Sequence, residues 1–185
     1  MGNSLGGNML ILEKIEYSEY DKESVKLFLK DNKIKKYLLG RNEYSKELSK
    51  LIYIDGFIDD FTEEKEFEGK KIFNLKEIEK ESIVVSCSNL RPITSKINID
   101  KSGIRNIDSF LFWKLSEIEM NSMKYMKEQV DDIDRNFEKY EKIYELLEDE
   151  ESKKFFFNII NFRNSMNIKY LRNFNVFTTF SSDGD

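Results

Sequence analysis

Hydrophobic residues follow two different spacings in this chain, and the spacing changes near residue 104. Before that point, short apolar runs bounded by polar residues predict strands at residues 34–39, 52–58, 67–72 and 83–87. Apolar positions three and four residues apart predict helices at residues 43–51 and 75–80, and the first of these places Tyr44, Leu48 and Leu51 on one face. Strands that alternate with helices imply an α/β fold with a parallel sheet and right-handed crossovers.

Glycine and proline are nearly absent from the second half of the chain. No glycine occurs between Gly103 and Gly184, and the one proline is Pro92, so little there would interrupt a helix. Residues 109–147 should be largely helical, with a heptad-like stripe at Met126, Val130, Ile133, Phe137, Tyr140, Tyr144 and Leu147. Asp149 should cap a further helix with an apolar face at Phe155, Ile159, Phe162 and Met166. An all-helical C-terminal extension is therefore expected to follow the sheet.

These patterns divide the chain into four parts. Residues 1–33 should be an N-terminal leader, flexible over its first eight residues, and a short helix that leads to Lys30 and is capped by Asp21 or Ser24. Residues 34–108 should form a small Rossmann-like domain of the nucleotide-binding type, and residues 109–173 a helical linker or bundle. Residues 174–185 read as a truncated tail.

Composition and charge narrow the class of protein. Hydrophobic residues make up 39% of the chain and charged residues 35%, with 15 Phe and 9 Tyr, which is typical of a folded protein with charge-covered helices. The net charge of −5 is spread along the chain without a block of Lys and Arg, so we expect no nucleic-acid partner. No apolar run approaches the roughly 20 residues that span a bilayer, so we expect no membrane association.

Cysteine and histidine content limits the chemistry. Cys87 is the one cysteine and histidine is absent, which excludes an intramolecular disulfide and the usual zinc sites. Cys87 ends a predicted buried strand, where a cysteine is usually a small core residue, and it has no histidine to activate it. We therefore expect a cytoplasmic protein with no metal site and no assignable catalytic residue.

The turn after the first predicted strand resembles a dinucleotide-binding loop. Such a loop needs glycines so that its backbone can approach a pyrophosphate on a helix N-terminus. The G-x-G-x-x-G positions hold Gly40, Asn42 and Ser45. Asn tolerates a positive φ and Ser is small, so the geometry is possible with one glycine of three. Arg41 is placed to pair with a phosphate, although a lone Arg in a loop is more often simply solvated.

Two carboxylates end the second predicted strand. Asp59 and Asp60 lie where an acidic side chain would accept hydrogen bonds from a ribose diol. The alternative is that both cap the following turn, and the two readings are evenly balanced. The predicted binding residues are therefore Gly40, Arg41, Asn42, Ser45, Asp59 and Asp60.

Three segments resemble the region that precedes the catalytic domain in FkbM-family S-adenosylmethionine-dependent methyltransferases, which modify bacterial glycans and related metabolites. The segments are residues 37–60 with 67–72, residues 83–88, and the helical residues 137–163. The front half also resembles the nucleotide-sugar-binding domain of some sugar acyltransferases. By that resemblance, residues 40–45 with Asp59 and Asp60 would line a nucleotide-sugar pocket.

The resemblance implies a non-catalytic or incomplete part of a glycan-modifying methyltransferase that binds a nucleotide-sugar or a glycan. Residues after 104 lack the glycine-rich turn that holds the cofactor in a family member, so we expect S-adenosylmethionine only in a full-length relative and no cofactor in this chain. The chain would then be a fragment or a shortened reading frame. The alternative is a helical interaction protein, with a degenerate nucleotide-binding fold, in which residues 126–147 pair two chains into a homodimer. An NAD-dependent dehydrogenase ranks last because the glycine loop is substituted.

Overall fold

The structure, a computed structural model, describes residues 9–172. These residues form two compact units, one from Glu16 to Tyr125 and the other from the remaining described residues. The predicted leader of residues 1–8 and the tail of residues 174–185 lie outside the described residues.

The first unit is an α/β unit with a six-stranded sheet in the order β3-β4-β2-β1-β5-β6. Its strands are β1 (Lys36–Leu39), β2 (Gly56–Ile58), β3 (Glu66–Phe67), β4 (Lys70–Phe73), β5 (Ile83–Ser86) and β6 (Arg105–Asp108). Every neighbouring pair is parallel except β3 and β4, which form a hairpin through Gly69 at φ +72°. The predicted α/β, Rossmann-like fold class is therefore confirmed.

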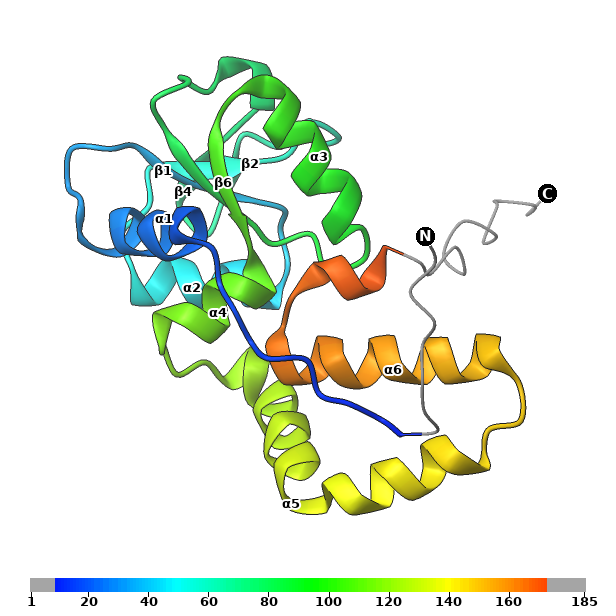
Figure 1. Cartoon of the computed structure of the whole chain (residues 1–185). Coiled ribbons are helices and arrows are strands. Elements are labelled where there is room, and N and C mark those ends of the chain that lie inside the picture. The colour runs from blue at the N-terminus through cyan, green and yellow to red at the C-terminus, as the bar shows by residue number, and fades with distance from the viewer. Residues whose placement is uncertain (1–8, 173–185) are drawn as a thin grey trace. The chain divides into compact units, whose positions relative to one another are not determined.

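Helices cover both faces of this sheet (Figure 1). The helices of this unit are α1 (Glu19–Lys30), α2 (Glu43–Leu51), α3 (Pro92–Ser102) and α4 (Ser109–Ser116), with 3₁₀ turns η1 (Leu75–Glu77) and η2 (Asn121–Met123). Right-handed crossovers place α2 and α3 on opposite faces. Helices α1 and α4 pack together on the α2 side, where the Phe28 and Phe112 rings meet edge to face at 5.3 Å.

Successive side chains of a strand point to opposite faces of the sheet, and this alternation determines which residues enter the core on each face. On the α3 face, Tyr37, Ile58 and Val84 of three neighbouring strands pack with Ile99 of α3 in one buried cluster. Residues one position along, such as Leu38, point to the opposite face. Both faces of the central strands are buried, and residues 37–39 of β1 and 83–85 of β5 accordingly form continuous apolar runs.

Several predicted details of this unit are wrong. Ser18, and neither Asp21 nor Ser24, caps α1 by accepting from the Asp21 amide. Leu51 is 51% exposed because α2 ends there, although Tyr44 and Leu48 are buried as predicted. The strand predicted over residues 52–58 is limited to β2, and the helix predicted over residues 75–80 is the short turn η1. Helix α3 and strand β6 were not predicted as elements.

The second unit contains α5 (Lys124–Leu146), α6 (Glu150–Ser165), the 3₁₀ turn η3 (Ile168–Leu171) and the extended segment of residues 9–15. Asn161 of α6 fixes that segment, because it accepts from the Glu13 amide at 2.8 Å and donates to the Ile11 carbonyl at 3.1 Å. Leu10, Ile133 and Ile160 form the buried centre of the unit.

The predicted stripe of α5 packs partly within its own unit. Ile133 is fully buried, and Phe137, Tyr140 and Tyr144 pack against the same core. Asn136 interrupts the helix with φ −124°, so the stripe does not run along one straight helix. The homodimer through residues 126–147 stays a prediction.

The start of α6 is as predicted, because Asp149 caps it by accepting from the Ser152 amide at 2.7 Å. Its predicted apolar face is wrong in part. Phe155 is 45% exposed, and Ile160 lies in the core in place of Ile159. Within residues 9–172, no helix has the length and apolar character needed to cross a membrane.

Candidate functional site

The strand order creates a topological switch point between β1 and β5. The chain proceeds outward from β1 to β2 and β4 on one side, and from β5 to β6 on the other. In open parallel sheets, ligands bind beside such a point, in the crevice at the carboxyl ends of the strands. The loops that follow β1 and β2 carry all the predicted site residues except Ser45, which lies in the first turn of α2, so the fold brings them to this one edge.

The turn after β1 satisfies much of its own hydrogen bonding. Gly40 adopts φ +96°, a conformation that favours glycine, and its amide donates to the Ile58 carbonyl at 3.0 Å. Asn42 caps α2 by accepting from the Ser45 amide at 3.0 Å, and the Ser45 hydroxyl accepts from the Asn42 amide at the same distance. Two donors that a phosphate would use are therefore already occupied.

Asn42 also joins the two halves of the sheet. Its side-chain amide donates to the Cys87 carbonyl at 2.6 Å, across the switch point from α2 to the loop after β5. A Cβ on Gly40 would lie 3.6 Å from the same carbonyl. The crevice between the two loops is thus closed at its base, and a ligand would lie on top of this contact.

Arg41 is held by carboxylates. Its Nε donates to Asp59 Oδ2 at 2.7 Å and its terminal nitrogen to Glu64 at 2.6 Å, and the guanidinium lies 5.8 Å from the centre of the Phe67 ring. The hydrogen bond that Arg41 donates to Asp59 is the main reason that the pKa of Arg41 is raised. Sequence reasoning treated Arg41 and Asp59 separately, whereas the structure makes them a pair.

Asp59 and Asp60 both accept backbone hydrogen bonds. Asp59 Oδ1 accepts from the Phe61 amide at 3.0 Å, and Asp60 Oδ1 accepts from the Leu75 amide at 2.7 Å. This is the arrangement expected from the turn-capping alternative. Asp59 has its second oxygen on Arg41, but Asp60 Oδ2 has no hydrogen-bond partner in the described part of the chain.

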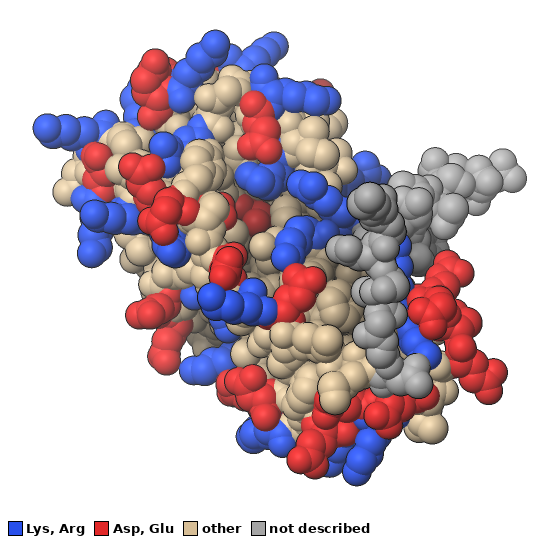
Figure 2. Space-filling model, viewed as in Figure 1, with Lys and Arg blue, Asp and Glu red and all other residues tan. Residues whose placement is uncertain are grey.

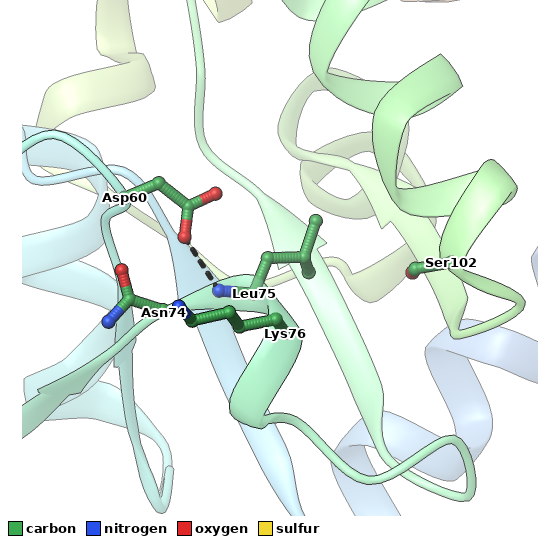
Figure 3. A pocket seen from close by; sticks show the side chains of 5 residues that line it. All are labelled: Asp60, Asn74, Leu75, Lys76 and Ser102. Carbon is green, nitrogen blue, oxygen red and sulfur yellow. Dashed lines mark hydrogen bonds between the residues drawn. The ribbon is translucent and has the colours of Figure 1, made fainter.

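An open pocket of about 440 Å³ lies beside Asp60. Its walls are Asp60, Asn74, Leu75, Lys76 and Ser102 (Figure 3). The pocket lies where a crossover helix would cover the sheet in a regular doubly wound fold, because the connection from β4 to β5 contains only η1. Asp60 is the one predicted site residue that lines it.

Near the carboxyl edge, three residues that were not predicted to interact form a hydrogen-bonded group, which links α2, the start of α4 and the loop after β5. The Tyr44 hydroxyl of α2 donates to the Ser109 carbonyl at 3.0 Å, and the Ser109 hydroxyl donates to Asn89 at 3.3 Å in the loop after β5. Burial raises the pKa of Tyr44. The helical spacing of Tyr44 predicts only a core position, and its polar contact has no local sequence signal.

Asp108 is the most perturbed acid of this edge. It ends β6 and caps α4 by accepting from the Phe110 and Leu111 amides at 3.1 and 3.0 Å. Burial raises its pKa to about 6, against the lowering effect of the Leu111 amide and of Lys96. The signal available in the sequence was an Asp directly before an apolar helical run, which is a helix N-cap pattern.

Cys87 is a buried core residue, as predicted. It is fully buried and burial raises the pKa of its thiol, which disfavours the nucleophilic thiolate. Within residues 9–172, no group of three or more acidic or thiol side chains is arranged to hold a metal ion.

Positive and negative side chains are interspersed on the face of the molecule shown in Figure 2. Over the described atoms of the face shown in Figure 2, blue and red side chains alternate and no continuous basic stripe is visible. Binding of an anionic ligand to this face would therefore depend on individual hydrogen-bond donors rather than on a broad positive electrostatic potential.

The comparisons with known proteins concern the fold. A crystal structure with a similar fold is that of a methyltransferase, FkbM from Methylobacillus flagellatus KT, with a TM-score of 0.59 and 14% sequence identity. The match covers 88% of this chain and 45% of the methyltransferase, so the chain spans about half the length of that protein. No family model and no curated protein sequence matches the chain. The chain therefore has an FkbM-like, methyltransferase-like fold.

Proposed function

We propose that this chain is a non-catalytic ligand-binding part of an FkbM-like, glycan-modifying methyltransferase system, and that it binds a nucleotide-sugar or a glycan. The binding surface is the pocket beside Asp60, which extends from the end of β2 to the end of α3. The protein acts in the cytoplasm, and S-adenosylmethionine binding belongs to a longer relative and not to this chain.

The pocket beside Asp60 is the observation that carries the proposal. It combines one carboxylate oxygen that lacks a partner in the described chain with the Asn74 amide and the aliphatic surfaces of Leu75 and Lys76. Sugars present hydroxyl donors around an apolar ring face, and a carboxylate beside an apolar wall suits that chemistry. Asp60 is fixed by the Leu75 amide, so its free oxygen is preorganised.

The acids and thiol described above support a binding role without catalysis. Asp59 is paired with Arg41, Asp108 caps a helix, and Cys87 is buried with a raised thiol pKa. Each of these groups has a structural task that would conflict with proton transfer or nucleophilic attack.

Isothermal titration calorimetry with UDP-glucose, UDP-N-acetylglucosamine and GDP-mannose tests the proposal, with S-adenosylmethionine in parallel. Asp60→Asn keeps an acceptor for the Leu75 amide and removes the charge, so it should weaken binding by about 1–3 kcal/mol. The matched control is Asp31→Asn. Asp31 also accepts turn amides, from Lys33 and Ile34, but it precedes β1 at the opposite edge of the sheet.

Equal affinities of the Asp60→Asn and Asp31→Asn proteins would move the site away from this pocket. Failure of the folded wild-type protein to bind any of the three nucleotide-sugars would count against the nucleotide-sugar proposal, and a glycan array would then test the glycan alternative. A saturable heat of binding in the titration with S-adenosylmethionine would contradict the assignment of the cofactor to a longer relative.

A helical interaction protein is the second candidate function. The observation in its favour is an apolar pocket of about 330 Å³ at the α5 and α6 turn, lined by residues that include Leu147, Phe155 and Phe156. Ile143 and Leu146 are also exposed there. A homodimer would appear as a doubled mass in sedimentation equilibrium, lost in Leu146→Glu. A monomer at high concentration would refute it.

A further inference from the structure

Helix α3 begins without a side-chain cap. Its N-cap residue, Arg91, makes no capping hydrogen bond, and Pro92 occupies the first turn. The amide groups of Ile93 and Thr94 have no hydrogen-bond partner within residues 9–172. By contrast, α1, α2, α4 and α6 each begin with a side-chain oxygen that accepts from a first-turn amide. The first turn of α3 therefore has donors to offer.

The N-terminus of α3 carries a positively charged residue, where a negatively charged one is usual. Arg91 is exposed and makes no ion pair within the described chain, and the first turn of α3 holds no acidic residue. A cation at a helix N-terminus opposes the helix dipole, whereas an anion between them would be favoured by both.

A second observation comes from Ser86, the last residue of β5. Ser86 is 1% exposed, and its hydroxyl has no hydrogen-bond partner. It points to the same face of the sheet as Val84, which packs with Ile99 of α3. Because α3 begins at the carboxyl edge and runs back along the sheet, Ser86 lies on the face that α3 covers, at the end of the sheet where α3 begins. A buried hydroxyl without a partner is costly, and at the carboxyl end of β5, next to the uncapped start of α3, a ligand would supply the missing partner.

Two charged side chains near Ser86 are already engaged. Asp108 pairs in register with Ser86, but its carboxylate accepts from the amides that begin α4. Lys96 donates to Asn106 at 3.3 Å and lies 3.6 Å from Asp100. Arg91 is therefore the cation available to a ligand at the first turn of α3.

We propose that the first turn of α3, with Arg91 and Ser86, binds a phosphate or pyrophosphate group. The Ile93 and Thr94 amides donate to its oxygens and Arg91 supplies the positive charge. Residues 87–91 adjust so that the Ser86 hydroxyl also donates to the anion. The anion site is thereby assigned to α3 and not to the turn after β1, where Asn42 occupies the Ser45 amide.

The inference rests on the proposed function only for the source of the anion, because a nucleotide-sugar carries a pyrophosphate and inorganic phosphate is a free form of the same chemistry. The test uses amide-resolved NMR titrations of the full chain with inorganic pyrophosphate, UDP-glucose and uridine. The largest shifts with pyrophosphate and with UDP-glucose should fall on the Ile93 and Thr94 amides, and uridine should leave these amides unchanged.

Two matched pairs of variants locate the site. Ser86→Ala and Ser82→Ala each remove a buried serine hydroxyl that has no partner, at opposite ends of β5. Arg91→Gln and Lys101→Gln each remove one exposed cation, at opposite ends of α3. Ser86→Ala and Arg91→Gln should each raise the pyrophosphate Kd about tenfold, the effect of one charge-assisted hydrogen bond. Ser82→Ala and Lys101→Gln should leave the Kd unchanged.

The outcomes separate the two proposals. Pyrophosphate shifts centred on α2, or equal effects within each pair of variants, would overturn the α3 site. UDP-glucose binding that Ser86→Ala and Arg91→Gln do not weaken would also overturn it, while leaving the proposed function intact. Pyrophosphate binding at α3 without nucleotide-sugar binding would support the anion site and contradict the nucleotide-sugar ligand. Absence of binding by either probe would overturn the α3 site, and the other nucleotide-sugars and the glycan array would then decide the proposed function.

Discussion

Replacing Asp108 by Asn should stabilise the α/β unit at neutral pH and have little effect in acid. Asn and Asp are about equally good helix N-caps, so Asp108→Asn keeps the acceptor for the Phe110 and Leu111 amides. What it removes is the charge, which is 3% exposed and costly to bury.

The size of the effect follows from the pKa. The folded protein holds Asp108 at a pKa of about 6 against an ordinary value of 3.8, and a tenfold change in proton affinity is about 1.4 kcal/mol, so the charged form costs about 3 kcal/mol of stability. The folded pKa lies above the unfolded one. The free energy of unfolding of the wild-type protein is therefore reduced least below the unfolded pKa of Asp108. The reduction grows as the pH rises from about 4 to about 6.

Urea unfolding followed by tryptophan fluorescence measures this effect. The chain's one tryptophan, Trp113, lies in α4, the helix that Asp108 caps. The stability gained by Asp108→Asn should rise to about 3 kcal/mol at neutral pH, fall to about 0.5 kcal/mol near pH 4 and vanish at lower pH. A difference that stays constant with pH, or a variant less stable than the wild type at neutral pH, would refute the reasoning.

The pKa of Asp149 is shifted in the opposite direction, so its effect on stability should have the opposite pH dependence. It is an exposed N-cap whose pKa is lowered, chiefly by the hydrogen bond from the Ser152 amide. Its contribution to stability is therefore present above its unfolded pKa and lost as the pH falls. Asp149→Asn should lower the helical stability measured by circular dichroism at neutral pH and have less effect in acid.

Two further substitutions test the helical unit. Ile133→Ala should cost about 2–5 kcal/mol in urea unfolding because Ile133 is fully buried, whereas Leu146→Ala, at a side chain that is 79% exposed, should leave the midpoint nearly unchanged. Equal costs would contradict the packing of α5. Asn161→Ala should release residues 9–15 by leaving the Glu13 amide and Ile11 carbonyl unpaired. Faster hydrogen exchange at Glu13 checks this, and unchanged exchange would contradict it.

Elements with strong local signals could be predicted from the sequence. Helix α2 has the predicted bounds because Asn42 and Ser45 form a capping box and Tyr44 and Leu48 repeat at helical spacing. Strand β5 is a β-branched run and was found for that reason. Helix α3 was missed because it buries one apolar residue, Ile99, and so has almost no amphipathic pattern.

The candidate site was less accessible to sequence reasoning because its contacts join distant residues. Position alone placed Asp59 and Asp60 at the carboxyl edge, but the pairing of Asp59 with Arg41 depends on how β1 and β2 lie side by side. The unpaired hydroxyl of Ser86 can be recognised only once its surroundings are known.

The measurement that tests the central claim most directly is calorimetric titration of the wild-type chain with UDP-glucose, UDP-N-acetylglucosamine and GDP-mannose, repeated with Asp60→Asn and Asp31→Asn. The account predicts saturable binding of at least one nucleotide-sugar, weakened by about fivefold or more in Asp60→Asn and unchanged in Asp31→Asn. No binding by the folded protein, or binding that both substitutions leave unchanged, would contradict a nucleotide-sugar site at the carboxyl edge of the sheet.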